Sequence, residues 1–171
     1  DFSDIKKVFD KYLPVYDIKA DNNVLNSYNS IKKGYLLTKN KFCSSLITLP
    51  INKEKIIKKI DSTFIGQTEF LQKLDKKEYS NMIFYSKKIM VTTLTTHIPL
   101  NKINFYLNQK EIIYQKIYSL NQSLIKDFNI LNPKFVICGI NPHAGENGTI
   151  GNEEKKILKP IIRKLINKGI N

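Results

Sequence analysis

The sequence predicts an α/β fold, in which a largely parallel or mixed sheet is covered by helices. The prediction comes from short runs rich in β-branched and aromatic residues that alternate with longer segments of helical period. The 171 residues include 42% hydrophobic and 11% aromatic residues, enough to build a core. No repeat or low-complexity linker interrupts residues 1–171, so we assign no internal domain boundary.

The first predicted strand and helix are separated by a proline. Residues 44–49 (Ser-Ser-Leu-Ile-Thr-Leu) form an apolar run typical of a buried strand, and Pro50 ends it. A lysine-rich helix is expected over 51–60, because its isoleucines recur on one face. A shorter helix is expected over 66–74.

In the rest of the chain, strands are expected over 82–85 and 89–95 and a long helical segment over 101–128. A further strand is expected over 134–140 and a closing helix over 152–168. The long segment carries one apolar stripe at helical spacing, which predicts a core-facing helix. The strand over 134–140 is continuously apolar, as in a fully buried strand. Pro160 lies within the closing helix and is a candidate kink.

The charge, the cysteines and the lengths of the apolar runs exclude several classes of partner and site. The net charge of +13 comes almost entirely from lysine, since Arg163 is the only arginine, so we expect a solvated surface and no nucleic-acid partner. Cys43 and Cys138 are isolated within apolar runs, which predicts buried free thiols and no disulfide. No apolar run is long enough to span a membrane, and no targeting signal is evident. We therefore expect a cytoplasmic protein with no membrane partner.

The two histidines of the chain each follow a predicted strand. His97 lies in Thr-Thr-His-Ile-Pro-Leu and His143 in Asn-Pro-His-Ala-Gly-Glu. Ligands bind beyond the carboxyl ends of strands in open α/β sheets, and imidazole is the commonest ligand of zinc-type metals. A catalytic site usually takes three protein ligands, and Glu69 and Glu146 are candidates for the third. The alternative is that both histidines are hydrogen-bonded structural residues and that Glu146 is exposed or caps a helix.

Two glycine-containing segments are candidates for phosphate binding. Gly66 opens a predicted helix, and the loop over 145–151 leads into another, so backbone N–H groups and the helix dipole favour an anion at both. Lys53, which follows the predicted strand over 44–49, is a candidate to contact a bound phosphate. The alternative is that Lys53 is one more surface lysine.

Four ordered motifs resemble the 4-hydroxythreonine-4-phosphate dehydrogenase family of pyridoxal phosphate biosynthesis. The longest, Ile-Asn-Pro-His-Ala-Gly-Glu-Asn-Gly, contains His143 and closely resembles the family's Leu-Asn-Pro-His-Ala-Gly-Glu-x-Gly. The other three are similar to the family's Thr-Thr-His-Leu-Pro-Leu, Gly-His-Thr-Glu-Phe and Val-Thr-Gly-Pro-Ile-Asn-Lys, and they lie over residues 95–100, 66–71 and 46–53.

The resemblance implies a reaction and a set of site residues. The reaction is a metal-dependent, NAD- or NADP-linked oxidation of 4-phosphooxy-threonine, with decarboxylation to 3-amino-2-oxopropyl phosphate. By resemblance, His97 and His143 bind the divalent metal (Zn, Mg or Co), and Gln67 and Thr68 bind the phosphorylated hydroxyamino acid. In the family, a third metal-binding histidine comes from a downstream Tyr-His-Asp-Gln segment, which this chain does not contain.

The resemblance also implies an architecture. It is a homodimer of two-domain subunits with an αβα layered mixed sheet of the isocitrate-dehydrogenase type. The chain would then be the central part of that fold, truncated at both ends.

The chain departs from the family pattern at two positions. Gln67 stands where the family has a substrate-contacting histidine, and Leu49 replaces a glycine. A glutamine can hydrogen-bond to a substrate but carries no charge. These departures leave three alternatives open: a truncated or degenerate non-catalytic homologue, a paralogue acting on 4-phospho-threonate or 4-phospho-erythronate, and a basic interaction protein that reuses the scaffold.

Overall fold

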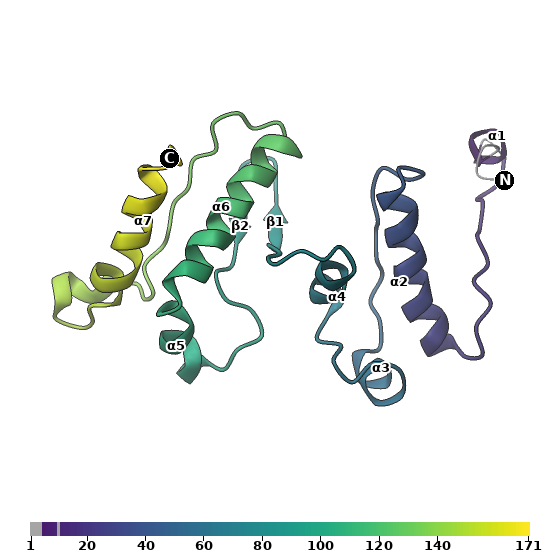
Figure 1. The fold of residues 1–171 in the computed structure, drawn as a ribbon, viewed down its shortest axis with the longest axis horizontal. Coiled ribbons are helices and arrows are strands. Elements are labelled where there is room, and N and C mark those ends of the chain that lie inside the picture. Colours follow the sequence, from purple (N-terminus) through teal and green to yellow (C-terminus); the bar gives the residue numbers. More distant parts are fainter. Residues whose placement is uncertain (1–4, 10) are drawn as a thin grey trace. The chain divides into compact units, whose positions relative to one another are not determined.

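The computed structural model describes residues 5–9 and 11–171. The chain divides into two compact units, over residues 1–78 and 79–171, and each is described by itself. Figure 1 shows the helices and strands in chain order.

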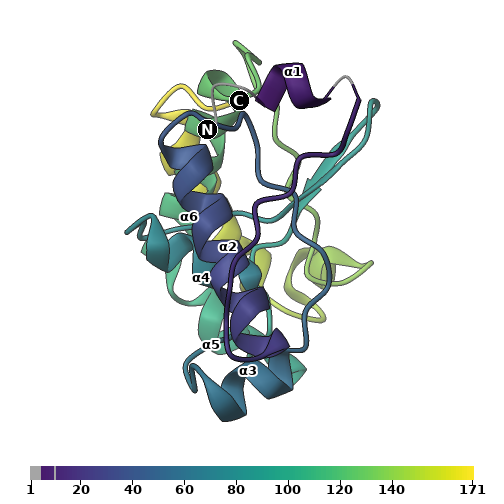
Figure 2. The same ribbon diagram turned by 90° about the vertical axis from the view of Figure 1, so that its right-hand side faces the viewer.

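The first unit is helical. It contains α1 (Ile5–Phe9), α2 (Asn23–Lys39), α3 (Lys53–Lys59) and α4 (Gln67–Leu74). The Asn22 side chain caps α2 by accepting hydrogen bonds from the first-turn backbone N–H groups of Val24 and Leu25. Helix α2 contacts α3 and α4 (Figure 2). The shared core of this unit consists of Tyr28, Ile31, Ile56, Phe64 and Phe70.

The second unit combines a small sheet with helices. Strands β1 (Ile83–Tyr85) and β2 (Met90–Thr92) pair antiparallel, with Phe84 opposite Val91. The helices that follow are η2 (Leu100–Lys102), α5 (Ile103–Leu107), α6 (Lys110–Lys126), η3 (Ala144–Gly148), the π-helix η4 (Glu154–Leu158) and α7 (Lys159–Ile166).

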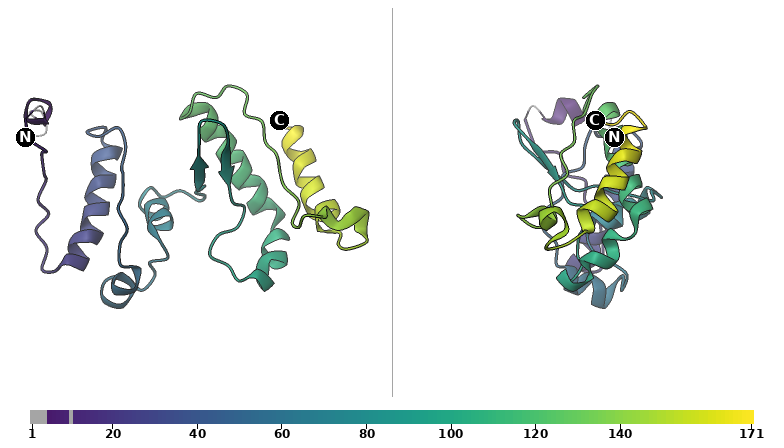
Figure 3. Two further views of the ribbon diagram at one scale, coloured as in Figure 1. Left: turned by 180° about the vertical axis from the view of Figure 1, so that it is seen from behind. Right: turned by 90° about the vertical axis from the view of Figure 1, so that its left-hand side faces the viewer.

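The core of the second unit lies between α6 and α7, which pack side by side (Figure 3). Its buried residues are Leu107, Ile113, Tyr114, Ile117, Ile157, Ile161, Leu165 and Ile170. The apolar stripe expected in the long helical segment is therefore confirmed as core.

The predicted layered sheet is not present within the described residues, where the sheet consists of β1 and β2 alone. The predictions of strands over 44–49 and 134–140 are wrong for this structure, because neither segment has a ladder partner there. Ile47 and Val136 are 87% and 89% exposed, in contrast to the buried strands expected. The α/β class holds in its coarse form, helices with a small sheet.

The helix predictions are close, and the structure sets their ends. Asn52 caps α3 through its side chain, so the helix starts at Lys53 and not directly after Pro50. The long helical segment is interrupted at 108–109 and forms α5 and α6. Pro160 lies at the start of α7, directly after the π-helix, and the helical backbone is continuous through both, so its missing N–H falls within a helical run where the hydrogen-bond pattern changes from π to α.

The prediction of buried thiols is wrong, because Cys43 and Cys138 are both exposed free cysteines. Cys138 belongs to the unpaired segment 134–140, so no neighbouring strand covers it. Cys43 lies in the turn that follows α2, where its backbone N–H donates to the Leu37 carbonyl oxygen. No helix in the described part of the chain is long and apolar enough to cross a bilayer.

Candidate functional site

His97 lies in the segment that follows β2. Its backbone is left-handed, with φ of 57°, and its side chain is exposed. Upstream, Lys116 on α6 donates a hydrogen bond from Nζ to the Leu94 carbonyl oxygen at 3.0 Å. Leu94 also packs against the core of the second unit. The segment that carries His97 is thus anchored to α6 at one end.

His143 lies directly before η3 and makes two local contacts. Its backbone N–H donates to Oδ1 of Asn141 at 2.9 Å, and its ring Nδ1 lies 2.9 Å from Oε1 of Glu146. The His143 side chain is 64% exposed. When Nδ1–H donates to the carboxylate, the tautomer leaves Nε2 as the free acceptor. A metal-binding histidine is commonly oriented by this kind of contact.

The turn after His143 has an unusual backbone. Residues 144–148 all have positive φ, including 73° at Gly145. A Cβ on Gly145 would lie 2.5 Å from the backbone oxygen of Gly151, so the turn closes tightly on that residue. Glu154 accepts a hydrogen bond from the Ile140 N–H at 2.9 Å, which ties the two sides of the loop together. The motif around His143 is therefore a compact turn rather than a flexible one.

The donor set suits a transition metal but is not complete in the structure. Both imidazoles are exposed, and imidazole nitrogen is a good ligand for zinc and similar cations. Across residues 5–9 and 11–171, no group of three or more His, Cys, Asp or Glu side chains could hold a metal ion. Of the candidate third ligands, Glu146 contacts His143 and Glu69 belongs to the first unit.

In the first unit, the start of α4 brings together the two positions at which the sequence departs from the family pattern. Nε2 of Gln67 donates to the backbone oxygen of Leu49 at 3.0 Å. Oε1 of Gln67 and Oε2 of Glu69 are buried and have no hydrogen-bond partner. Thr68, between them, is exposed. Sequence reasoning missed the contact of Gln67 with Leu49, and the only signal for it was that both positions differ from the pattern.

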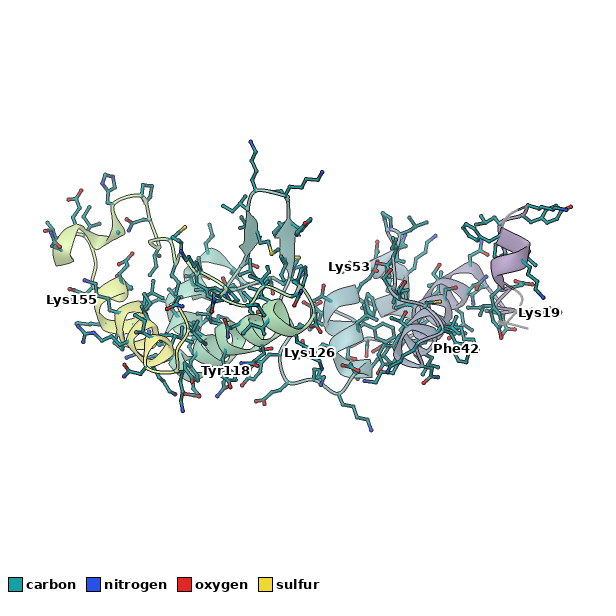
Figure 4. The ribbon with its side chains drawn as sticks, turned by 90° about the horizontal axis from the view of Figure 1, so that it is seen from above. Lys19, Phe42, Lys53, Tyr118, Lys126 and Lys155 are labelled. Atoms are coloured by element: carbon teal, nitrogen blue, oxygen red, sulfur yellow. The ribbon has the colours of Figure 1, made fainter. Side chains whose placement is uncertain are left out.

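Lys53, which begins α3 and is labelled in Figure 4, lies close to the same turn. A Cβ on Gly66 would be 2.8 Å from Oε2 of Glu69 and 3.8 Å from Nζ of Lys53. The Glu69 carboxylate and the Lys53 ammonium group therefore both lie close to the space that a side chain at position 66 would occupy. Gly66 also gives α4 no side-chain cap.

A pocket of about 250 Å³ lies on the same unit. Its lining residues are Asp61, Thr63, Phe64, Ile65, Glu69, Phe70 and Lys73. Hydrogen bonds from the side chain and backbone of Thr63 lower the pKa of Asp61, and the Tyr28 hydroxyl contributes a further bond. This carboxylate is thus already satisfied by the protein, whereas Oε2 of Glu69 is not.

Comparisons with known proteins identify the family. The model of the family described as "Pyridoxal phosphate biosynthetic protein PdxA" matches residues 7–171. The chain belongs to this family. The resemblance inferred from the four motifs is therefore confirmed.

Individual relatives carry two different names. A 4-hydroxythreonine-4-phosphate dehydrogenase from Sulfurihydrogenibium sp. is 39% identical over 131 residues, which cover 76% of this chain and 40% of the relative. A D-threonate 4-phosphate dehydrogenase from Pectobacterium atrosepticum is 32% identical over 145 residues, covering 85% of this chain and 44% of the relative. The chain thus spans less than half the length of these two relatives.

A solved structure supports the fold assignment. The crystal structure of 4-hydroxythreonine-4-phosphate dehydrogenase from Klebsiella pneumoniae is similar with a TM-score of 0.73 and 27% identity, over 85% of this chain and 43% of that one. The architecture of the chain is therefore that of a segment of a family member.

Proposed function

We propose that this chain is the central part of a two-domain 4-hydroxythreonine-4-phosphate dehydrogenase. The reaction is the NAD- or NADP-linked oxidation of 4-phosphooxy-threonine, followed by decarboxylation to 3-amino-2-oxopropyl phosphate. The observation that carries the proposal is the His143–Glu146 contact, because a carboxylate at 2.9 Å from Nδ1 leaves Nε2 as a metal-binding nitrogen. Family membership supports the reaction class.

In this proposal His97 and His143 hold a divalent metal, and the third protein ligand comes from outside this chain. The cation, when bound, supplies Lewis-acid stabilisation of the reacting oxygen. The residues of the chain orient the metal ligands and the substrate: Glu146 holds the His143 ring, while Gln67 and Thr68 bind the substrate. The protein acts as a cytoplasmic homodimer.

Metal analysis of the complete gene product tests this proposal. We expect about one divalent ion per subunit in the purified protein and near-complete loss in His143→Ala. Gln122→Ala, an exposed change on α6, is the matched control and keeps the metal. Unchanged metal content in His143→Ala would refute the ligand assignment. NAD(P)H production from 4-phosphooxy-threonine tests the reaction itself.

A second candidate function is the oxidation of 4-phospho-threonate. It is favoured by the relative named D-threonate 4-phosphate dehydrogenase and by the replacement of the family histidine at Gln67. Parallel assays with the two compounds distinguish these functions.

A further inference from the structure

The hairpin formed by β1 and β2 is held at both of its ends by one residue of α6. Before β1, the Asn81 side chain donates from Nδ2 to the Lys116 backbone oxygen at 3.2 Å. After β2, the Lys116 ammonium group donates from Nζ to the Leu94 backbone oxygen at 3.0 Å. Both bonds are partly buried, which limits the competition from water. Lys116 therefore joins the start and the end of the hairpin to the same turn of α6.

The bond to Leu94 is a strong one for a side chain and a backbone oxygen. Its donor is a charged ammonium group, and charge-assisted hydrogen bonds are about twice as strong as neutral ones. The Leu94 side chain also packs against the core of the second unit, so this residue is held through its backbone and its side chain. Without the ammonium group, the partly buried Leu94 oxygen would lose this donor, which is unfavourable.

His97 follows Leu94 by three residues and has a second anchor on its other side. Pro99 has a φ of −64°, which its ring fixes, and its backbone oxygen accepts from the Lys102 N–H at 2.9 Å. Ile103, which begins α5, packs against the same core as Leu94. Three extended residues span at most about 11 Å, so a displacement of Leu94 is transmitted directly to His97.

The position of the His97 ring depends on the course of this backbone. The φ of 57° at His97 lies in the left-handed region, which is unfavourable for a residue with a Cβ. Such a conformation persists where the surrounding contacts determine it. The His97 side chain is exposed, so burial in a core does not fix the ring. The anchors on either side of His97 are the contacts that remain to do so.

We propose that Lys116 is a positioning residue, which fixes the course of residues 95–98 and thereby places His97 for metal binding. This inference rests on the proposed function, in which His97 is a ligand. An ammonium group has no lone pair to offer a cation, so Lys116 acts through the backbone and is not itself a ligand. Contacts that orient a metal ligand contribute to metal affinity by about 10- to 100-fold.

Zn²⁺ affinity of the complete gene product tests this role, measured by competition with a chromophoric chelator. We expect Lys116→Met, which keeps the aliphatic stem, to weaken Zn²⁺ binding by about 10-fold or more, and Lys116→Arg, which keeps a cationic donor, to restore most of it. In a His97→Ala background, Lys116→Met should cause no further loss. Lys126→Met, at an exposed lysine of the same helix (Figure 4), is the control and leaves the affinity unchanged.

A second measurement reports on the backbone without metal. In the metal-free protein labelled with ¹⁵N-histidine, the backbone N–H signals of His97 and His143 are assigned from their alanine variants. Lys116→Met should move or broaden the His97 signal and leave the His143 signal in place, whereas a general loss of stability would change both. Lys116→Gln, which shortens the side chain and removes its charge, gives the same comparison if the methionine variant does not fold.

The outcomes separate this inference from the proposed function. Equal weakening of Zn²⁺ binding by Lys116→Met with His97 present and with His97 replaced overturns the positioning role. Loss of affinity in His97→Ala but not in Lys116→Met upholds the ligand and overturns the positioning role. A moved His97 signal in Lys116→Met, with full Zn²⁺ affinity in His97→Ala, upholds the positioning of this segment and overturns the ligand assignment. No change in either measurement overturns both.

Discussion

Nδ1 of His143 and Oε1 of Glu146 lie 2.9 Å apart within one tight turn. The contact holds the imidazole ring in one orientation and increases the electron-donating character of its other nitrogen. A partner of this kind contributes to metal affinity without touching the metal.

Glu146→Gln should therefore weaken divalent metal binding by about 10- to 100-fold while His143 is still present. Competition with a chromophoric chelator measures the affinity in the complete gene product. Asp127→Asn, at an exposed carboxylate that ends α6, should leave it unchanged. The same affinity in Glu146→Gln as in the unmodified protein would show that the carboxylate does not orient a ligand.

Gly145→Ala should destabilise the protein more than Gly169→Ala. Both glycines have positive φ, 73° and 77°, so both substitutions carry a backbone penalty of about 1 kcal/mol. A Cβ at 145 would also lie 2.5 Å from the Gly151 oxygen, whereas one at 169 meets nothing within 4 Å. Urea unfolding compares the two variants. Equal losses would mean that the close approach to Gly151 does not constrain the turn.

Ile56→Ala should cost about 2–5 kcal/mol of stability, because it leaves a cavity in the core of the first unit. Ile56 is 1% exposed and packs among Tyr28, Phe64 and Phe70. Ile57, its neighbour on α3, is 40% exposed, and Ile57→Ala should cost far less. Chemical denaturation measures both. Similar costs at the two positions would contradict the packing of α3.

Acid should weaken the first unit through Asp61. Hydrogen bonds from the Thr63 hydroxyl and N–H hold the pKa of Asp61 below its ordinary value of 3.8. The stabilisation is therefore present above that value and is lost as the pH falls through the lower folded-state pKa. Asp61→Asn should flatten the dependence of the urea midpoint on pH in this acidic range. An unchanged dependence would assign the acid sensitivity to other carboxylates.

Helices α3, α4, α6 and α7 were predictable from the sequence because helical hydrogen bonds are local, although α2 was not predicted. The apolar spacing of α6 predicted its buried face, and the polar residue before α3 could cap it without any distant contact. The four motifs were equally local, and the family match confirms the resemblance drawn from them.

The strands and the cysteines were not predictable in the same way. A β-strand needs hydrogen bonds from another segment, and apolar composition does not name that segment. Residues 44–49 and 134–140 have strand-like sequences, yet they pair with no strand among the described residues. The exposure of Cys138 follows from that missing pairing, whereas Cys43 lies in the turn after α2.

The sequence by itself determined the family, the helices α3, α4, α6 and α7 and the identity of the candidate ligands His97 and His143, but it did not predict α2. Only the tertiary structure decided how Gln67 is oriented, since its amide bonds to Leu49, a residue 18 positions away in the chain. That contact leaves Oε1 as the free acceptor beside Glu69. Local patterns name the residues at a site, but the direction of a side-chain hydrogen bond depends on which distant backbone group the fold brings to it.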